Sequence, residues 1–178
     1  KIRLSLFTHR VRLGTQKGLC TLLFHCAGRH VFLNLALLAG RTFILEGGFS
    51  ARNVPRWLHE TKATVFFGVL MMYALLIQQP IFQPTYMPHL RLCTYAAAPM
   101  PVSLIERLHL QFTTVALQNC YGQTENGPCA TTLYDEQIEH SASVGKAINE
   151  AMMIRIVDTD GVSYKLAVRE KLRFQGHS

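Results

Sequence analysis

From His30 onward, helix-like and strand-like segments alternate along the chain with short connections between them. Helices are expected where apolar residues keep helical spacing or where a Gly or Pro closes the segment, at 31–39, 51–61, 69–78 and 101–112. Strands are expected in the apolar segments between them, at 42–45, 63–67, 91–96 and 114–119. This order is typical of a parallel sheet flanked by helices. The sequence therefore predicts an α/β fold with a mostly parallel sheet.

The last part of the chain has a different pattern. Segments 153–157 and 162–168 flank an Asp160-Gly161 turn, and the second segment alternates apolar and polar residues. This predicts a C-terminal antiparallel hairpin. A calcium loop is the alternative for the two aspartates, but the glycine lies at the wrong offset for an EF-hand. We expect three parts: a basic N-terminal segment at 1–18, an α/β core at 19–134, and a linker with the hairpin at 135–178.

The composition excludes a disordered chain, because 49% of the 178 residues are hydrophobic and can form a buried core. The net charge of +7 is gathered before Glu46, the first acidic residue. A solvated surface segment, a rim that attracts phosphate and a nucleic-acid-binding arm are three interpretations of that cluster. No aromatic interleaving or binding motif accompanies the basic residues, so we expect no nucleic-acid partner.

The cysteines and histidines give no sign of a metal site. The five cysteines include no Cys-x-x-Cys pair, which argues against a disulfide framework and a zinc site and makes a reducing cytosol the expected location. His25 and His30 lack the spacing of a helical ligand pair.

The apolar run at 63–77 is shorter than the roughly 20 residues that a transmembrane helix needs. We therefore expect no transmembrane segment.

Three strand-to-helix corners are candidates for a binding site, since ligands of open parallel sheets bind at the carboxyl ends of the strands. They lie at 68–72, 97–100 and 120–125. The first supplies apolar walls, the second an approachable backbone and the third polar groups. Within the third corner, Tyr121, Thr124 and Glu125 offer an aromatic face, a hydroxyl and a carboxylate, which suits a metal-bound phosphate beside an aromatic base.

Several short motifs in a fixed order carry a family resemblance. The motifs are Phe24-His25-Cys26-Ala27-Gly28, Gly68-Val69-Leu70-Met71-Met72-Tyr73, Ala97-Ala98-Pro99-Met100-Pro101, Tyr121-Gly122-Gln123-Thr124-Glu125, Ser143-Val144-Gly145-Lys146 and Ile154-Arg155-Ile156-Val157-Asp158. In this order they resemble the adenylate-forming superfamily, especially its acyl-CoA synthetases. The resemblance covers roughly residues 20–161.

The resemblance implies ATP-dependent activation of a small-molecule carboxylic acid to an acyl-adenylate, followed by transfer to coenzyme A. The implied cofactors are ATP, Mg²⁺ and coenzyme A. Thr124 and Glu125 would be the catalytic pair, with Thr124 on the α-phosphate and Glu125 on the metal. The implied nucleotide-binding residues are Ala97, Ala98, Pro99, Asn119, Tyr121 and Gly122. The implied acyl-substrate residues are His25, Gly68 and Met72.

Plainer interpretations stand beside these roles. Thr124 and Glu125 also fit an exposed turn, and a single histidine such as His25 also fits a hydrogen-bonded core position. Met72 also fits ordinary helix packing. Medium or long fatty acids and aryl acids are all compatible with the apolar corner.

The chain departs from the family pattern in ways that predict a partial N-terminal domain. The family's Ser/Thr-Gly-Thr-Thr-Gly-x-Pro-Lys-Gly loop is absent, and residues 14–18 are too short to replace it. The later ribose-binding aspartate and the C-terminal domain with its lysine are also absent. Leu70 replaces a proline, and the expected glycine is missing near Arg169. A catalytically inactive remnant or an interaction module of the same fold is therefore the alternative to a functional part of an enzyme.

Overall fold

The structure is a computed structural model that describes residues 16–19, 25–125, 127–133, 140, 143–148, 159 and 172–173. The strands are β1 (Gln16–Leu19), β2 (Thr42–Leu45), β3 (Val65–Val69), β4 (Leu92–Ala96), β5 (Ala116–Gln123), β6 (Gly127–Leu133), β7 (Ser143–Ala147) and β8 (Leu172–Arg173). The helices are the π-helix η1 (Ala27–Leu33) and the α-helices α1 (Asn34–Leu38), α2 (Val54–Glu60), α3 (Leu70–Leu76) and α4 (Val102–Gln111). The part of the chain outlined by these ranges contains no helix long and apolar enough to cross a membrane.

One sheet runs through the molecule in the order β2-β1-β3-β4-β5-β6-β7-β8. The pairs from β2 through β5 are parallel, and those from β5 through β8 are antiparallel. The predicted α/β class with a parallel sheet and flanking helices is confirmed. The hairpin expected at 153–168 lies outside the described residues.

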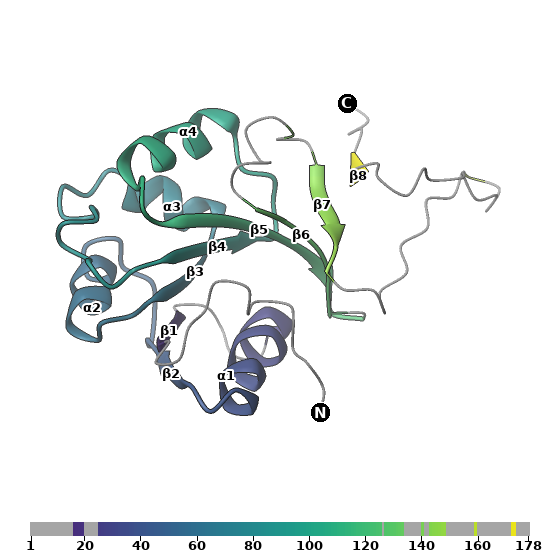
Figure 1. Cartoon of the computed structure of the whole chain (residues 1–178), viewed down its shortest axis with the longest axis horizontal. Coiled ribbons are helices and arrows are strands. Elements are labelled where there is room, and N and C mark those ends of the chain that lie inside the picture. Colours follow the sequence, from purple (N-terminus) through teal and green to yellow (C-terminus); the bar gives the residue numbers. More distant parts are fainter. Residues whose placement is uncertain are drawn as a thin grey trace.

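Helices cover both faces of the parallel part of the sheet (Figure 1). Helices α3 and α4 lie on one face, and η1 with α1 lies on the other. Alternation along β3 explains this arrangement, because Phe66 belongs to the core on the α3 side and Phe67 to the core on the η1 side. Both faces are apolar, as expected for parallel strands that are buried on each side.

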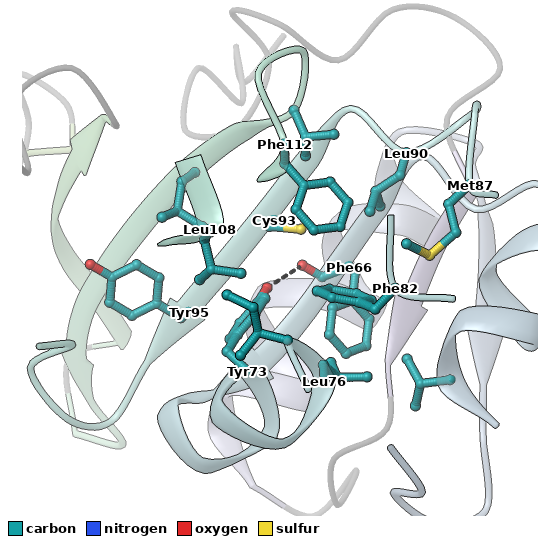
Figure 2. Close-up of a cluster of buried hydrophobic side chains, with 14 of the residues drawn as sticks. Phe66, Tyr73, Leu76, Phe82, Met87, Leu90, Cys93, Tyr95, Leu108 and Phe112 are labelled. Carbon is teal, nitrogen blue, oxygen red and sulfur yellow. Dashed lines mark hydrogen bonds between the residues drawn. The ribbon is translucent and has the colours of Figure 1, made fainter. Parts of the chain in front are cut away.

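The larger core lies under α2, α3 and α4, and Figure 2 shows its centre. From α4 it receives Leu104, Ile105 and Leu108, which share one face of the helix. Tyr73 of α3 is fully buried, and its hydroxyl donates to the carbonyl oxygen of Thr94 at 3.0 Å and faces that of Phe66 at 3.4 Å. This phenol therefore ties α3 to β3 and β4.

Burial keeps the polar atoms of this core in their neutral forms. It raises the pKa of the Tyr73 phenol well above its usual value and that of the neighbouring Cys93 thiol to about 12, and the pKa of Tyr95 is also raised by burial. A thiol held this far from ionisation is a packing residue rather than a nucleophile.

The smaller core lies between η1 and the sheet. Its buried members are Val31, Phe32 and Phe67, and the rings of Phe32 and Phe67 stand 4.5 Å apart between centroids. Phe43 of β2 and Ala96 of β4 pack against them. Among the described residues, far fewer buried side chains lie on this side of the sheet than on the α3 side.

Three details of the sheet differ from the prediction. Gly68 was expected to end its strand, but β3 continues to Val69 because Gly68 and Val69 pair with Tyr95 and Ala96 of β4. The strand expected at 114–119 continues to Gln123, because β6 returns alongside it. The sequence also did not predict β1, β6 or β7.

Candidate active site

The carboxyl ends of β4 and β5 lie side by side, because the strands are parallel and pair Tyr95 with Asn119. The corners that follow therefore meet on one rim of the sheet. They enclose a cavity of about 430 Å³, which we name the rim pocket. Its lining residues are Ala97, Ala98, Pro99, Asn119, Cys120, Tyr121, Gly122, Gln123, Ser143 and Val144.

Ala97 makes the turn out of β4 with a positive φ of 79°. Residues that carry a Cβ rarely adopt a positive φ, and those that do are found most often at functional sites. The conformation turns the chain sharply at the rim, so that Ala98 and Pro99 become exposed wall residues instead of extending the strand.

A second cavity of about 320 Å³, which we name the inner pocket, lies on the η1 side of the sheet. Its walls come from the start of η1, from β3, β4 and β5, and from α3. The lining residues are His25, Cys26, Ala27, Val31, Phe32, Phe67, Val69, Met72, Ala96, Ala97, Cys120, Tyr121, Gly122, Gln123 and Gly127. Most of these side chains are apolar, so the pocket suits a hydrocarbon or aromatic group.

The two pockets adjoin at one corner. Ala97 from the end of β4 lines both of them, as does the β5 run from Cys120 to Gln123. A ligand with a polar head and an apolar tail could therefore place its head in the rim pocket and its tail in the inner pocket.

Most residues singled out from the sequence lie at these pockets. All six implied nucleotide-binding residues line the rim pocket, and His25 and Met72 line the inner pocket. Thr124 and Glu125 follow directly after β5 as exposed turn residues, and neither is among the residues that line the two pockets. Their expected roles stay predictions.

Gly68 faces away from the inner pocket. A Cβ placed on it would stand 3.1 Å from Cε1 of Phe66 and 3.2 Å from Cε2 of Tyr73, both in the larger core. Alternation along β3 instead turns Phe67 and Val69 toward the pocket. The structure thus places Gly68 in the packing beneath α3, on the opposite face from the residues that line the pocket.

His25 stands at the entrance of η1 and is exposed. Its Nδ1 accepts a hydrogen bond from the backbone N–H of Ala27 at 3.3 Å and lies 3.8 Å from Sγ of Cys26. With Nδ1 acting as an acceptor, the neutral ring carries its proton on Nε2. His25 is therefore an exposed residue that lines the inner pocket, and its hydrogen bond with Ala27 also orders the first turn of η1.

Several lining residues were given no role from the sequence. Cys120 belongs to the predicted corner at 120–125, and it lines both pockets together with Tyr121. Ser143 comes from β7, where its Oγ accepts the N–H of Gly145 at 3.1 Å. A strand so far along the chain reaches the rim only through the antiparallel order of β5, β6 and β7, which the sequence did not predict.

The residues that the structure describes offer no metal site built wholly from protein groups. Within the described ranges, no three His, Cys, Asp or Glu side chains gather in a way that could hold a metal ion. Mg²⁺ commonly binds one or two carboxylates and takes its other ligands from phosphates and water. Glu125, which follows β5 at the rim, is exposed and is the residue to which the sequence assigned the metal.

Comparison with known families decides the wider relationship. The family described as AMP-binding enzyme matches residues 7–169. The chain belongs to the AMP-binding enzyme family. The resemblance to adenylate-forming enzymes is thereby confirmed.

The related proteins include CoA ligases from bacteria and fungi. Marinolic acid–CoA ligase of Pseudoalteromonas sp. (strain SANK 73390) is 33% identical over 138 residues, which cover 74% of this chain and 21% of that enzyme. The acyl-CoA ligase sidI of Aspergillus fumigatus is 28% identical over 158 residues, which cover 87% of this chain and 27% of that enzyme. The chain thus spans about a quarter of the length of these relatives.

Solved structures share the fold. The N-terminal domain of FACL13 from Mycobacterium tuberculosis superposes with a TM-score of 0.76 at 23% identity, over 88% of this chain and 39% of that one. The partial N-terminal domain expected from the sequence agrees with this coverage.

Proposed function

We propose that this chain is part of an enzyme that activates a small-molecule carboxylic acid with ATP and then joins it to coenzyme A. The observation that carries the proposal is the junction of an exposed rim pocket with an apolar inner pocket at Ala97, Tyr121 and Gly122. The CoA ligases among the relatives support the same chemistry. We also keep the cytosolic location as a prediction.

In this proposal the rim pocket holds the nucleotide. The half-buried ring of Tyr121 offers a face for adenine, and the exposed backbone at Ala98 and Gly122 can approach the ligand closely. Thr124 would donate its hydroxyl to the α-phosphate, and Glu125 would hold Mg²⁺, which would supply positive charge next to the phosphate oxygens.

The acid lies with its tail in the inner pocket and its carboxylate at the junction. The carboxylate oxygen then attacks the α-phosphorus, the bond to the β-phosphate oxygen breaks, and pyrophosphate leaves. The chain's contribution is to hold the two reactants at one corner, since positioning removes much of the entropic barrier of a bimolecular step. The apolar walls formed by Phe32, Phe67 and Met72 keep water from the tail.

The proposal is tested by titrating the chain with ATP in the presence and absence of Mg²⁺ and comparing wild type with Glu125→Gln. We expect Glu125→Gln to weaken binding of Mg²⁺–ATP about ten-fold or more, because the variant loses the anionic metal ligand. Binding of ATP without Mg²⁺ should stay the same or become tighter, because the variant removes a negative charge near the phosphates. Glu106→Gln, which makes the same change at an exposed position on α4, is the matched control.

Two results would contradict the proposal. One is the absence of any Mg²⁺–ATP binding by the wild-type chain, which would favour a remnant or an interaction module. The other is equal Mg²⁺ dependence in wild type and Glu125→Gln, which would remove Glu125 from the metal site. A pyrophosphate-release assay with the acid added then distinguishes nucleotide binding from turnover.

A further inference from the structure

Gln118 in the middle of β5 has an unusual environment. Its side chain is only 5% exposed, and its Oε1 atom has no hydrogen-bond partner among the residues that the structure describes. A buried acceptor without a partner destabilises a fold, and in native proteins it usually marks a place where water or a ligand binds.

The strand register places Gln118 on the sheet face of the inner pocket, beneath residues that line the pocket, and Gln118 is not itself one of the lining residues. Side chains alternate along β5, so Gln118 shares a face with Cys120, which lines the pocket. In the sheet, Gln118 pairs with Thr94, and Thr94 pairs in turn with Phe67, another lining residue. Phe67, Thr94 and Gln118 therefore lie side by side on neighbouring strands, and we call them a row. Ala96 and Cys120 lie two residues nearer to the rim on the same face of the sheet.

The groups on this face are nearly all apolar. Val31 and Phe32 of η1 cover it together with Phe67. The exception is Thr94, whose hydroxyl donates to the carbonyl oxygen of Phe66 at 3.3 Å and keeps its own oxygen available as an acceptor. The row thus offers acceptors from Gln118 and Thr94, which would be matched by a hydrogen-bond donor on a ligand.

The depth of this row fits a chain of medium length. Three residue steps along the strands separate the row of Thr94 and Gln118 from Ala97 and Tyr121 at the rim, which corresponds to about 10 Å. If the acid's carboxylate lies at the junction of the pockets, the far end of a medium-length tail would reach the pocket wall at Phe67, from which a small shift of the lining would expose Gln118.

We propose that Gln118 is a specificity-determining residue whose amide oxygen accepts a hydrogen bond from a hydroxyl or N–H group at the far end of the bound acid. The substrate class would be medium-length acids with a terminal donor, such as ω-hydroxy acids. This inference rests on the proposed function, because it assumes that the acid's tail occupies the inner pocket.

The test compares the binding of octanoate, 8-hydroxyoctanoate and 2-hydroxyoctanoate to the chain by titration calorimetry. In wild type, 8-hydroxyoctanoate should bind more tightly than the other two. Gln118→Met, which has nearly the same shape without the amide, should reduce the preference for 8-hydroxyoctanoate over octanoate about five-fold or more, the usual contribution of one hydrogen bond. The ratio of the affinity for 2-hydroxyoctanoate to the affinity for octanoate should be the same in Gln118→Met as in wild type.

Gln78→Met is the matched control, because it makes the same change at an exposed position near the end of α3. The folded state of Gln118→Met without ligand should be at least as stable as that of wild type, with an equal or higher midpoint of urea denaturation, since the buried acceptor is gone. Gln118→Leu provides a second apolar variant if the methionine packs poorly.

The outcomes separate this inference from the proposed function. If wild type binds all three acids and the 8-hydroxy preference is the same in Gln118→Met, Gln118 does not select the substrate and a buried water satisfies its oxygen. If wild type binds none of the acids, the assignment of the inner pocket to an acid fails, and this inference fails with it. A preference lost in Gln118→Met and retained in Gln78→Met supports the inference.

Discussion

At the scale of single residues, Ala97 shows how the site constrains the backbone. It takes a positive φ where glycine would be easier, and it does so at the point where both pockets meet. The sequence indicated that this corner is approachable but gave no sign of its unusual torsion. Alanine has no preference for a positive φ, so the sequence does not predict this torsion. It follows from the position of Ala97 in the folded structure.

Substitutions at Ala97 should show the cost of this torsion. Ala97→Val should destabilise the fold by about 1–3 kcal/mol, because a β-branched side chain tolerates positive φ poorly. Ala97→Gly should leave stability within about 1 kcal/mol of wild type, since relief of strain is offset by the greater freedom of the unfolded chain. Urea denaturation followed by circular dichroism measures both, and equal stability of the valine and glycine variants would show that the corner is unstrained.

At the scale of elements, the segments with clear periodicity were predictable and the others were not. The strands β2 and β4 and the helix α4 lie within one or two residues of their predicted bounds, because apolar spacing and flanking Pro or Gly residues mark them. In contrast, β1 has the sequence Gln-Lys-Gly-Leu, which lacks both alternation and β-branched residues. It becomes a strand because it fills the space between β2 and β3.

Strand β6 was not predicted from the sequence for a different reason. It contains Pro128, and a proline normally argues against an internal strand. The register of β5 and β6 shifts between Tyr121 and Gly122, so that Tyr121 pairs with Ala130 and Gly122 with Pro128. Such an irregularity accommodates a residue that cannot donate to the ladder. The same unpredicted pairing lengthens β5 and brings Gln123 to the pockets.

Gly68 tests the packing between β3 and α3. Because Phe66 and Tyr73 leave room for at most a small side chain, Gly68→Leu should destabilise the fold by about 1–3 kcal/mol. Gly47→Leu is the matched control, since among the described residues nothing lies within 4 Å of a Cβ at that position. Chemical denaturation of both variants measures the difference, and equal losses at the two positions would contradict the close packing around Gly68.

At the scale of the whole molecule, the inner pocket lies on the side of the sheet that has fewer buried residues in the part of the chain that the structure describes. Twenty buried residues of the described chain form the core under α2, α3 and α4, whereas three form the core under η1. Regions with few buried contacts open more easily than the rest of a protein. The layer that covers the inner pocket is therefore the one that can move without unfolding the larger core.

Hydrogen exchange measured by mass spectrometry should show this difference. Backbone amides in η1 and α1 should exchange faster than those in α4. This difference in exchange rate, which we call the gap, should become smaller when octanoate occupies the inner pocket, because the ligand adds contacts to Val31 and Phe32. Phe32→Ala should widen the gap, because it removes one of the three buried members of the smaller core. Uniform protection across the helices on both faces would contradict a separate, less stable layer.

The reversal of direction after β5 also decides how charge is balanced at the rim. The β4 corner leads into α4, whereas the β5 corner returns as β6, so the segment that carries Thr124 and Glu125 has no helix start behind it. Helix starts are the usual backbone source of positive potential for phosphates in α/β proteins. An anionic group bound beside Glu125 would meet a second negative charge there, and only a cation shared between the two would make the encounter favourable. The topology of a single hairpin would in this way make nucleotide capture conditional on the supply of divalent ions.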